Sequence, residues 1–327
     1  MSNIESVLNI EKKRSIVIPM VILTALFFIL GFVTWLNGPL IPFFEIACDL
    51  NGSQAYFVTF AFYIAYFVMA IPSSWVIEKV GYKKGVSLGL IVIATGAFMF
   101  YPAAEMRTFL LFLIALFIMG TGLAILQTAA NPYVVVIGSR ESAAARISVL
   151  GIANKLAGFI APLVLTALVL SNMKDYTKEK IEVLDAVAKS KVLDQLTLQL
   201  QTPYIYMGIT ILVLALLISL SPLPEIDLDE DSNVSDLSIF QQIKNASKYP
   251  QLVLGVITLM LYIAAEVIAG DSIGQFGKKL GVYGENGDFY LKLTSITMTA
   301  MVIGYILGIS LIPKYVSQVT ALKASGF

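Results

Sequence analysis

The amino-acid sequence predicts an all-α, multi-span membrane protein. Of the 327 residues, 57% are hydrophobic and 13% are charged, whereas soluble domains carry about 25% charged residues. The mean hydropathy is +0.82. Apolar runs long enough to cross a bilayer, about 20 residues each, recur eight times along the chain. Because lipid offers backbone amides no hydrogen-bond partner, each run should form a helix.

The predicted spans follow a polar segment, residues 1–16, that we expect to be cytoplasmic. Their boundaries are set by the ends of the apolar runs. The eight spans are predicted over residues 17–42, 54–77, 85–103, 108–137, 146–170, 203–221, 250–276 and 290–312.

Basic residues concentrate in every second link between these spans. The positive-inside rule therefore places these links and the N-terminus in the cytoplasm. The residues that indicate this orientation are Lys12, Lys13, Arg14, Lys79, Lys83, Lys84, Arg140, Arg146, Lys244, Lys248, Lys314 and Lys323.

Two longer connectors divide the chain. Residues 173–200 alternate charged and apolar residues at helical spacing, which predicts an external amphipathic helix. Residues 222–249 begin "SPLPEIDLDEDSNVSD" and predict a flexible, acidic cytoplasmic linker followed by a surface helix. This linker separates a predicted six-helix bundle, residues 17–221, from residues 250–327, the start of a second bundle.

The second half is expected to be a duplicated unit of which two helices are present. The ending "LIPKYVSQVTALKASGF" is similar to "WVIEKVGYKKGVSLG", because both join an apolar helix to the next through a short lysine-bearing link. Coincidence is the alternative, since short basic links are common in membrane proteins. We expect truncation, with the last two helices packed against the first bundle and an apolar face left open.

The first span contains residues that are unusual in lipid. In "TWLNGPLIPFF", Trp35 and Asn37 are followed by Gly38 and Pro39, which loosen the helix. Discontinuous helices are tolerated where they line a cavity. An amide both donates and accepts hydrogen bonds, and an aromatic face packs on the C–H side of a sugar ring. These residues therefore favour a neutral hydroxylated ligand, although Trp35 could instead be an interfacial residue.

Other spans carry further amides. Gln127 and Asn131 are four residues apart and hence share one face, and Asn154 lies in the fifth span. Each amide could simply bond a neighbouring helix. Gly151 and Gly158 are expected to be packing notches.

Three charged residues fall inside predicted spans. A buried Lys155 needs an acidic partner or a wet cavity, and the similarly placed acids are Glu266 and Asp271. Glu266 is the preferred partner because Asp271 could sit at the outer mouth of its helix, after a break at Gly270. Tyr262 shares a face with Glu266.

Composition also argues against several functions. The chain has no histidine and a single cysteine, Cys48, which excludes a disulfide framework and a cysteine-based metal site. A membrane-embedded enzyme would need a nucleophile–base pair or a metal constellation, and none is visible. We therefore expect no catalytic residue, no metal and no cofactor, and the zero net charge suggests no nucleic-acid partner.

Several segments resemble one family of transporters. They are "GFVTWLNGPLIPFF", "FAFYIAYFVMAIPSSWVIEKVGYKKG", "PAAE", "QTAANPY" and "LYIAAEVIAGDSIG". The chain resembles the fucose:proton symporter family of the major facilitator superfamily and is closest to the bacterial glucose/galactose and N-acetylglucosamine transporter group. The resemblance implies twelve helices in two bundles that alternate access to a midplane sugar site.

The resemblance carries over to individual residues. Asn37 matches an asparagine of the family in the first helix, and Asn154 matches a sugar-contacting asparagine. The fucose symporter has an aspartate where this chain has Gly38 and a glutamate where it has Gln127, so its proton mechanism cannot be transferred. Lys155 is a gain relative to that symporter.

These observations yield a set of candidate residues. The candidate substrate-binding residues are Trp35, Asn37, Gln127, Asn131, Asn154 and Tyr262. The candidate coupling residues are Lys155, Glu266 and Asp271, and the candidate gating loop contains Lys79, Gly81, Lys83 and Lys84.

The leading functional hypothesis is cation-coupled uptake of a neutral hexose by a multi-pass protein of the bacterial inner membrane. The driving ion would be a proton or sodium, the partners are the sugar and membrane lipid, and a monomer is expected when full length. The alternatives are an N-acetylglucosamine or fucose permease and a sugar sensor that does not transport.

Overall fold

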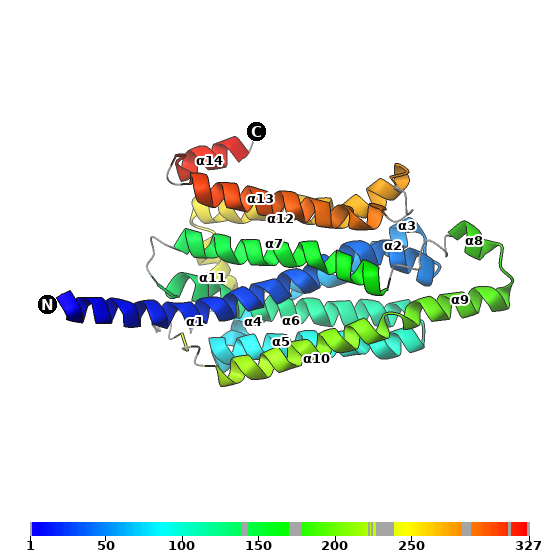
Figure 1. The fold of residues 1–327 in the computed structure, drawn as a ribbon, viewed down its shortest axis with the longest axis horizontal. Coiled ribbons are helices and arrows are strands. Elements are labelled where there is room, and N and C mark those ends of the chain that lie inside the picture. Colours follow the sequence, from blue (N-terminus) through cyan, green and yellow to red (C-terminus); the bar gives the residue numbers. More distant parts are fainter. Residues whose placement is uncertain are drawn as a thin grey trace.

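The computed structural model describes residues 2–138, 143–169, 178–221, 223, 225–226, 239–282, 289–312 and 315–325. Every regular element within these ranges is a helix (Figure 1). Eight of the described helical stretches are long and apolar enough to cross a membrane. The all-α, multi-span prediction is therefore confirmed.

The first six spans form one bundle. The first span is divided into α1 (Ser2–Trp35) and α2 (Asn37–Ala47). The other five are α4 (Phe57–Val80), α5 (Tyr82–Glu105), α6 (Phe109–Val136), α7 (Ala143–Leu168) and α10 (Gln201–Leu220).

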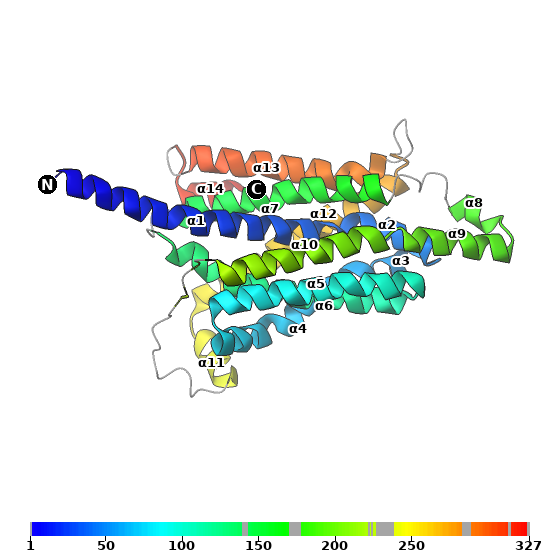
Figure 2. The same cartoon turned by 60° about the horizontal axis from the view of Figure 1, so that its bottom comes forward.

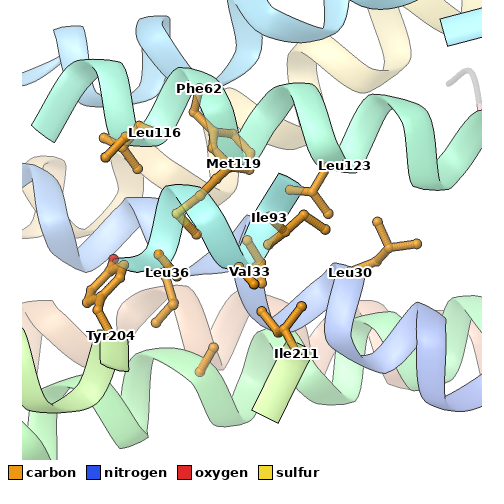
Figure 3. Packing of buried hydrophobic residues seen from close by; sticks show 14 of the residues in the cluster. Leu30, Val33, Leu36, Phe62, Ile93, Leu116, Met119, Leu123, Tyr204 and Ile211 are labelled. Carbon is orange, nitrogen blue, oxygen red and sulfur yellow. The ribbon is translucent and has the colours of Figure 1, made fainter. Parts of the chain in front are cut away.

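Segments far apart in the sequence lie side by side in this bundle. Helix α6 packs against α4 and α5, α10 packs against α5, and α1 packs against α7 (Figure 2). Apolar side chains from five helices meet between them, among them Phe62, Ile93, Met119 and Tyr204 (Figure 3). Close packing of these side chains holds the first span against its neighbours, and its break lies among them.

The remaining two spans pack against the first bundle. Helix α12 (Pro250–Lys279) lies against α2, and α13 (Leu293–Leu311), preceded by the short helix η3 (Phe289–Lys292), lies against α7. The outer face of α12 is apolar and open, since Leu254, Leu261 and Ile268 are 64%, 62% and 64% exposed. Both features agree with the arrangement expected for these two helices.

The external connector differs from its prediction. One helix was expected over residues 173–200, but the described part contains α8 (Lys178–Glu182) and α9 (Ala186–Leu198), and residues 173–177 lie outside it. The interruption is caused by Asp185, whose extended backbone and side chain cap α9 by accepting from the Ala188 amide at 2.7 Å.

Charged side chains hold α9 against two loops of the bundle. Arg107 donates to Asp194 at 2.8 Å, and Lys189 donates to Asp49 at 2.7 Å. Asp49 and Arg107 both have positive φ angles, 54° and 44°. Helix α9 therefore covers the two loops whose backbones are in the left-handed region.

The short helices mark the two ends of the bundle. The N-terminus, α11 (Ile239–Ala246) and α14 (Gln318–Ser325) lie at one end, and α3 (Gly52–Ala55), α8 and α9 lie at the other (Figure 1). Helix α11 is the surface helix predicted after the acidic linker. Most of that linker, together with Arg140 and Lys314, lies outside the described residues.

Candidate functional site

The first span is interrupted where its amide and proline residues indicated. Helix α1 ends at Trp35, Leu36 forms a turn, and α2 begins at Asn37. Pro39 has no N–H to donate to the Trp35 carbonyl, which removes one helical hydrogen bond at this point. The Asn37 side chain donates instead to the Thr34 carbonyl at 3.1 Å. The break thus presents Trp35 and Asn37 inside the protein.

Trp35 is enclosed by two glycines from distant parts of the chain. The residue is 2% exposed. A Cβ atom added at Gly158 of α7 would lie 2.6 Å from Trp35 Cδ1, and one added at Gly270 of α12 would lie 2.2 Å from Trp35 Cζ3. Only glycine leaves room for the indole at both positions. Trp35 is therefore a buried residue between α7 and α12, and the interfacial alternative is wrong.

Gly270 does not break its helix. A break before Asp271 was expected, but α12 is continuous from Pro250 to Lys279. The physical reason is that the missing side chain of Gly270 admits the Trp35 ring, while the surrounding residues keep the helical hydrogen bonds. The glycine at position 270 therefore indicates a close approach between helices and not a hinge.

Lys155 connects three helices. Its ammonium group forms an ion pair with Glu266 of α12 and lies 4.6 Å from the centre of the Trp35 ring. The side chains of Lys155 and Glu266 are 7% and 14% exposed. A buried cation is thereby compensated twice, by a carboxylate and by an aromatic face.

Asn154, the residue before Lys155, ties α7 to α1. Its Oδ1 accepts from the Trp35 indole N–H at 3.5 Å, and its Nδ2 donates to the Phe27 carbonyl at 3.3 Å. The structure thus brings together Trp35, Asn154, Lys155 and Glu266. We call these four residues the central cluster.

Tyrosines border the central cluster on the side of α13. Tyr262 is 55% exposed and lies beside Glu266 and Tyr305. The Tyr305 ring fills a notch at Gly151, where an added Cβ would lie 2.7 Å from it. Gly151 and Gly158 are therefore packing notches, as expected.

Asp271 lies at the interface of α12 with α2 and α4, which we call the α2–α12 seam. It is 1% exposed, so its carboxyl group is buried between helices, and its place near the outer mouth of α12 stays a prediction. Thr59 of α4 donates to one carboxyl oxygen at 3.5 Å, and the other oxygen has no hydrogen-bond partner among the described residues. A Cβ added at Gly38 would lie 3.5 Å from the Asp271 Cα atom and 3.0 Å from Thr294 Oγ1.

The same seam is closed at its far end by a polar cluster. Glu45 of α2 accepts from Gln275 at 3.0 Å and from Lys278 at 3.3 Å, both on α12. Thr59, Thr294 and Glu45 were not predicted from the sequence as site residues. Glu45 was detectable as an acid within an apolar run, whereas threonines are common in such runs and give no signal.

Gln127 and Asn131 are the two candidate amides of the fourth span. Both belong to α6, where Gln127 is half-buried and Asn131 is exposed. Within the described part of the chain, no hydrogen bond joins either amide to Trp35, Asn37 or Asn154. Their place at a ligand site stays a prediction.

The candidate gating loop contacts the end of another helix. The Lys83 ammonium donates to the Ser221 carbonyl at the end of α10, at 2.7 Å, and its backbone N–H donates to Glu225 at 3.2 Å. Gly81 has a φ of 84°, which favours glycine. Lys79 and Lys84 are exposed. The loop therefore ties α4 and α5 to the segment after α10.

The chain is similar to known transport proteins. The family model of the Major Facilitator Superfamily matches residues 23–324. A glucose/galactose transporter of Brucella abortus is 34% identical over 254 residues, which cover 78% of this chain and 57% of that protein. An L-fucose-proton symporter of Escherichia coli K12 is 31% identical over 304 residues, covering 93% of this chain and 69% of that protein.

Solved structures agree with these relatives. The crystal structure of the E. coli fucose:proton symporter matches with a TM-score of 0.74 at 29% identity, covering 92% of this chain and 72% of that one. The same transporter in an outward conformation matches with a TM-score of 0.71. The chain spans 57% of the Brucella relative's length. From the match over residues 23–324, the chain belongs to the Major Facilitator Superfamily.

Proposed function

We propose that this protein takes up a neutral hexose across the bacterial inner membrane, driven by a cation and by alternating access. The observation that carries the proposal is the central cluster, in which the indole at the helix break is joined to an amide of α7 and to a buried ion pair between α7 and α12. The relatives are named as glucose/galactose transporters and L-fucose-proton symporters, which supports a sugar as substrate. An N-acetylglucosamine or fucose permease is the alternative.

The sugar would bind where the first span is broken. Trp35 offers an aromatic face for the C–H side of a sugar ring, and Asn37 and Asn154 offer amides for its hydroxyl groups. Gln127, Asn131 and Tyr262 complete the proposed set. Trp35 is closed between Gly158 and Gly270, so we infer that α12 must move away from α1 before the indole can contact a ligand.

Coupling would act through the buried charges of α7 and α12. Lys155 holds Glu266 and Trp35 at the same time, so a change at the carboxylate also changes the surroundings of the indole. A change that separates Lys155 from Glu266 would alter the free energy of exposing the cavity. A static ion pair that only joins two helices is the competing interpretation.

The orientation is part of the proposal. The N-terminus and the basic link that contains Lys83 are assigned to the cytoplasm because positively charged links remain on that side. The glutamate–glutamine–lysine cluster around Glu45 would then lie at the outer end of the α2–α12 seam.

The test is uptake of labelled hexoses by the full-length protein in proteoliposomes, with proton and sodium gradients imposed separately. Accumulation of glucose or galactose driven by one of the two gradients is expected. Competition with N-acetylglucosamine and fucose distinguishes the alternative substrates. Sugar binding without uptake under either gradient would contradict transport and favour a sensor.

A further inference from the structure

The two acids of α12 face different parts of the protein. Glu266 and Asp271 are five residues apart, which is about 140° around an α-helix. Glu266 meets Lys155 of α7, whereas Asp271 meets Thr59 of α4 and the backbone side of Gly38 in α2. The two carboxyl groups therefore occupy separate environments and can hold different charges in the same conformation.

The surroundings of Asp271 contain hydroxyl groups and no cation within the described part of the chain. Thr59 reaches one carboxyl oxygen at 3.5 Å, at the long limit of a hydrogen bond, and the other oxygen is buried without a partner. The buried hydroxyl of Tyr63 lies near Asp271 and beside the side chain of Asn37. Thr294 directs its hydroxyl to the Gly270 carbonyl at 2.9 Å.

Two other charged residues of α12 are already paired. On α12 itself, Glu266 is held by Lys155 and Lys278 is held by Glu45 of α2. A negative charge on Asp271 would consequently be buried without a counterion, which is strongly unfavourable in a membrane interior. A protonated carboxyl group avoids this cost. Its O–H can also donate a hydrogen bond, which an ionised carboxylate cannot do.

We propose that Asp271 is the proton-binding site of this transporter and that it is protonated while α12 lies against α2. This inference rests on the proposed transport function and assigns the two acids different parts: Asp271 holds the proton, and Glu266 holds Lys155 beside Trp35. The proton is exchanged with water, and no other bond is made or broken.

The geometry explains how the proton is linked to movement. The backbone of α12 at Asp271 lies against Gly38 of α2, where an added Cβ atom would be in van der Waals contact with the Asp271 Cα atom at 3.5 Å. Loss of the proton leaves a charge that must be hydrated, and water reaches it only if the α2–α12 seam opens. Because Gly270 on the same turn covers Trp35, opening the seam also uncovers the indole. Proton release and exposure of the proposed sugar site are thus one change.

Infrared difference spectroscopy of the purified full-length protein in lipid tests the site without requiring transport. We expect a carbonyl-stretch band of a buried protonated carboxylic acid at neutral pH. Asp271→Asn should remove the band, since an amide mimics the protonated acid and should fold, whereas Glu266→Gln should keep it. Thr59→Val should shift its frequency, which gives a second test if the Asp271 variant is unstable.

Different results separate this inference from the proposed function. A band that survives in Asp271→Asn, or one that is removed by sodium instead of by raised pH, would overturn the proton site. If the band belongs to Asp271 but no hexose is transported under any gradient, the proton site stands and the proposed substrate is wrong. In sugar exchange, the pH dependence of the wild type should be lost in Asp271→Asn and retained in Glu266→Gln.

Discussion

The ammonium group of Lys155 lies 4.6 Å from the centre of the Trp35 ring while it also pairs with Glu266. One side chain thus links the helix break of the first span to the seventh span. A cation over an aromatic face contributes about 0.5–2 kcal/mol, depending on desolvation. Any change in the ion pair should therefore change the electrostatic surroundings of the indole that we assign to the sugar site.

Substituting Glu266 separates a coupling role from a structural one. In Glu266→Gln, sugar exchange should continue because the side chains of Trp35, Asn37 and Asn154 are all retained. Gradient-driven accumulation should fall at least about tenfold, which corresponds to a loss of only about 1.4 kcal/mol of coupling. Exchange and accumulation are measured in the same proteoliposomes, with Glu78→Gln at an exposed carboxyl as the control. Normal accumulation would show that Glu266 is only a helix-joining residue.

Gly270 and Gly255 provide a matched pair of substitutions on one helix. In Gly270→Ala, the new methyl group would meet the Trp35 ring at 2.2 Å, whereas a Cβ at Gly255 meets nothing within 4 Å. Overpacking of this kind costs about 1–3 kcal/mol. We expect lower thermal stability and weaker sugar binding in Gly270→Ala and neither effect in Gly255→Ala. Equal behaviour of the two variants would contradict the enclosed position of Trp35.

Lys83 and Lys84 test the candidate gating loop. Lys83 donates to the Ser221 carbonyl at 2.7 Å, whereas Lys84 is exposed. Lys83→Ala removes a charged hydrogen bond, which contributes about 1.5–3 kcal/mol, discounted here to about 1 kcal/mol because the contact is only partly buried. Thermal stability and the uptake rate should both fall in Lys83→Ala. An equal loss in Lys84→Ala would indicate a general effect of positive charge at this end of the protein.

The single cysteine should react slowly with maleimides. Burial raises the pKa of the Cys48 thiol to about 12, and the opposing effect of Arg107 is smaller. Because the thiolate is the reactive form, labelling at pH 7 should be slow and should rise about tenfold per pH unit up to at least pH 9. Ser53→Cys, at an exposed position of α3, serves as control, and its rate should level off near the ordinary thiol pKa of about 8.5. Equal rates for the two cysteines would show that Cys48 is not shielded.

The spans and the helix break were predictable because they depend on local composition. Apolar runs specify helices in lipid, and Pro39 cannot donate the hydrogen bond that would continue α1. The need of Lys155 for an acid was also foreseeable, since a charge in this environment requires compensation. These predictions use properties of a residue and its immediate neighbours.

The partners of the site residues could not be predicted in the same way. Thr59 and Asp271 are 212 positions apart, and whether they meet depends on how α4 and α12 are rotated about their axes. Gly270 carries the same sequence signal whether it permits a break or admits a ring from another helix. The sequence contains the residue types of the site but not the helix faces that bring them together.

Helix α9 can serve as a fixed reference point in measurements of movement between the two parts of the protein. It packs against α2 and α5, and its ion pairs reach Asp49 and Arg107, which lie on loops of the first bundle. It should therefore travel with that bundle as a rigid marker. The distance between a spectroscopic label on its exposed face and a second label near the end of α12 would report the movement of α12 relative to the first bundle. The distance from α9 to α3 should stay constant and would serve as the internal control.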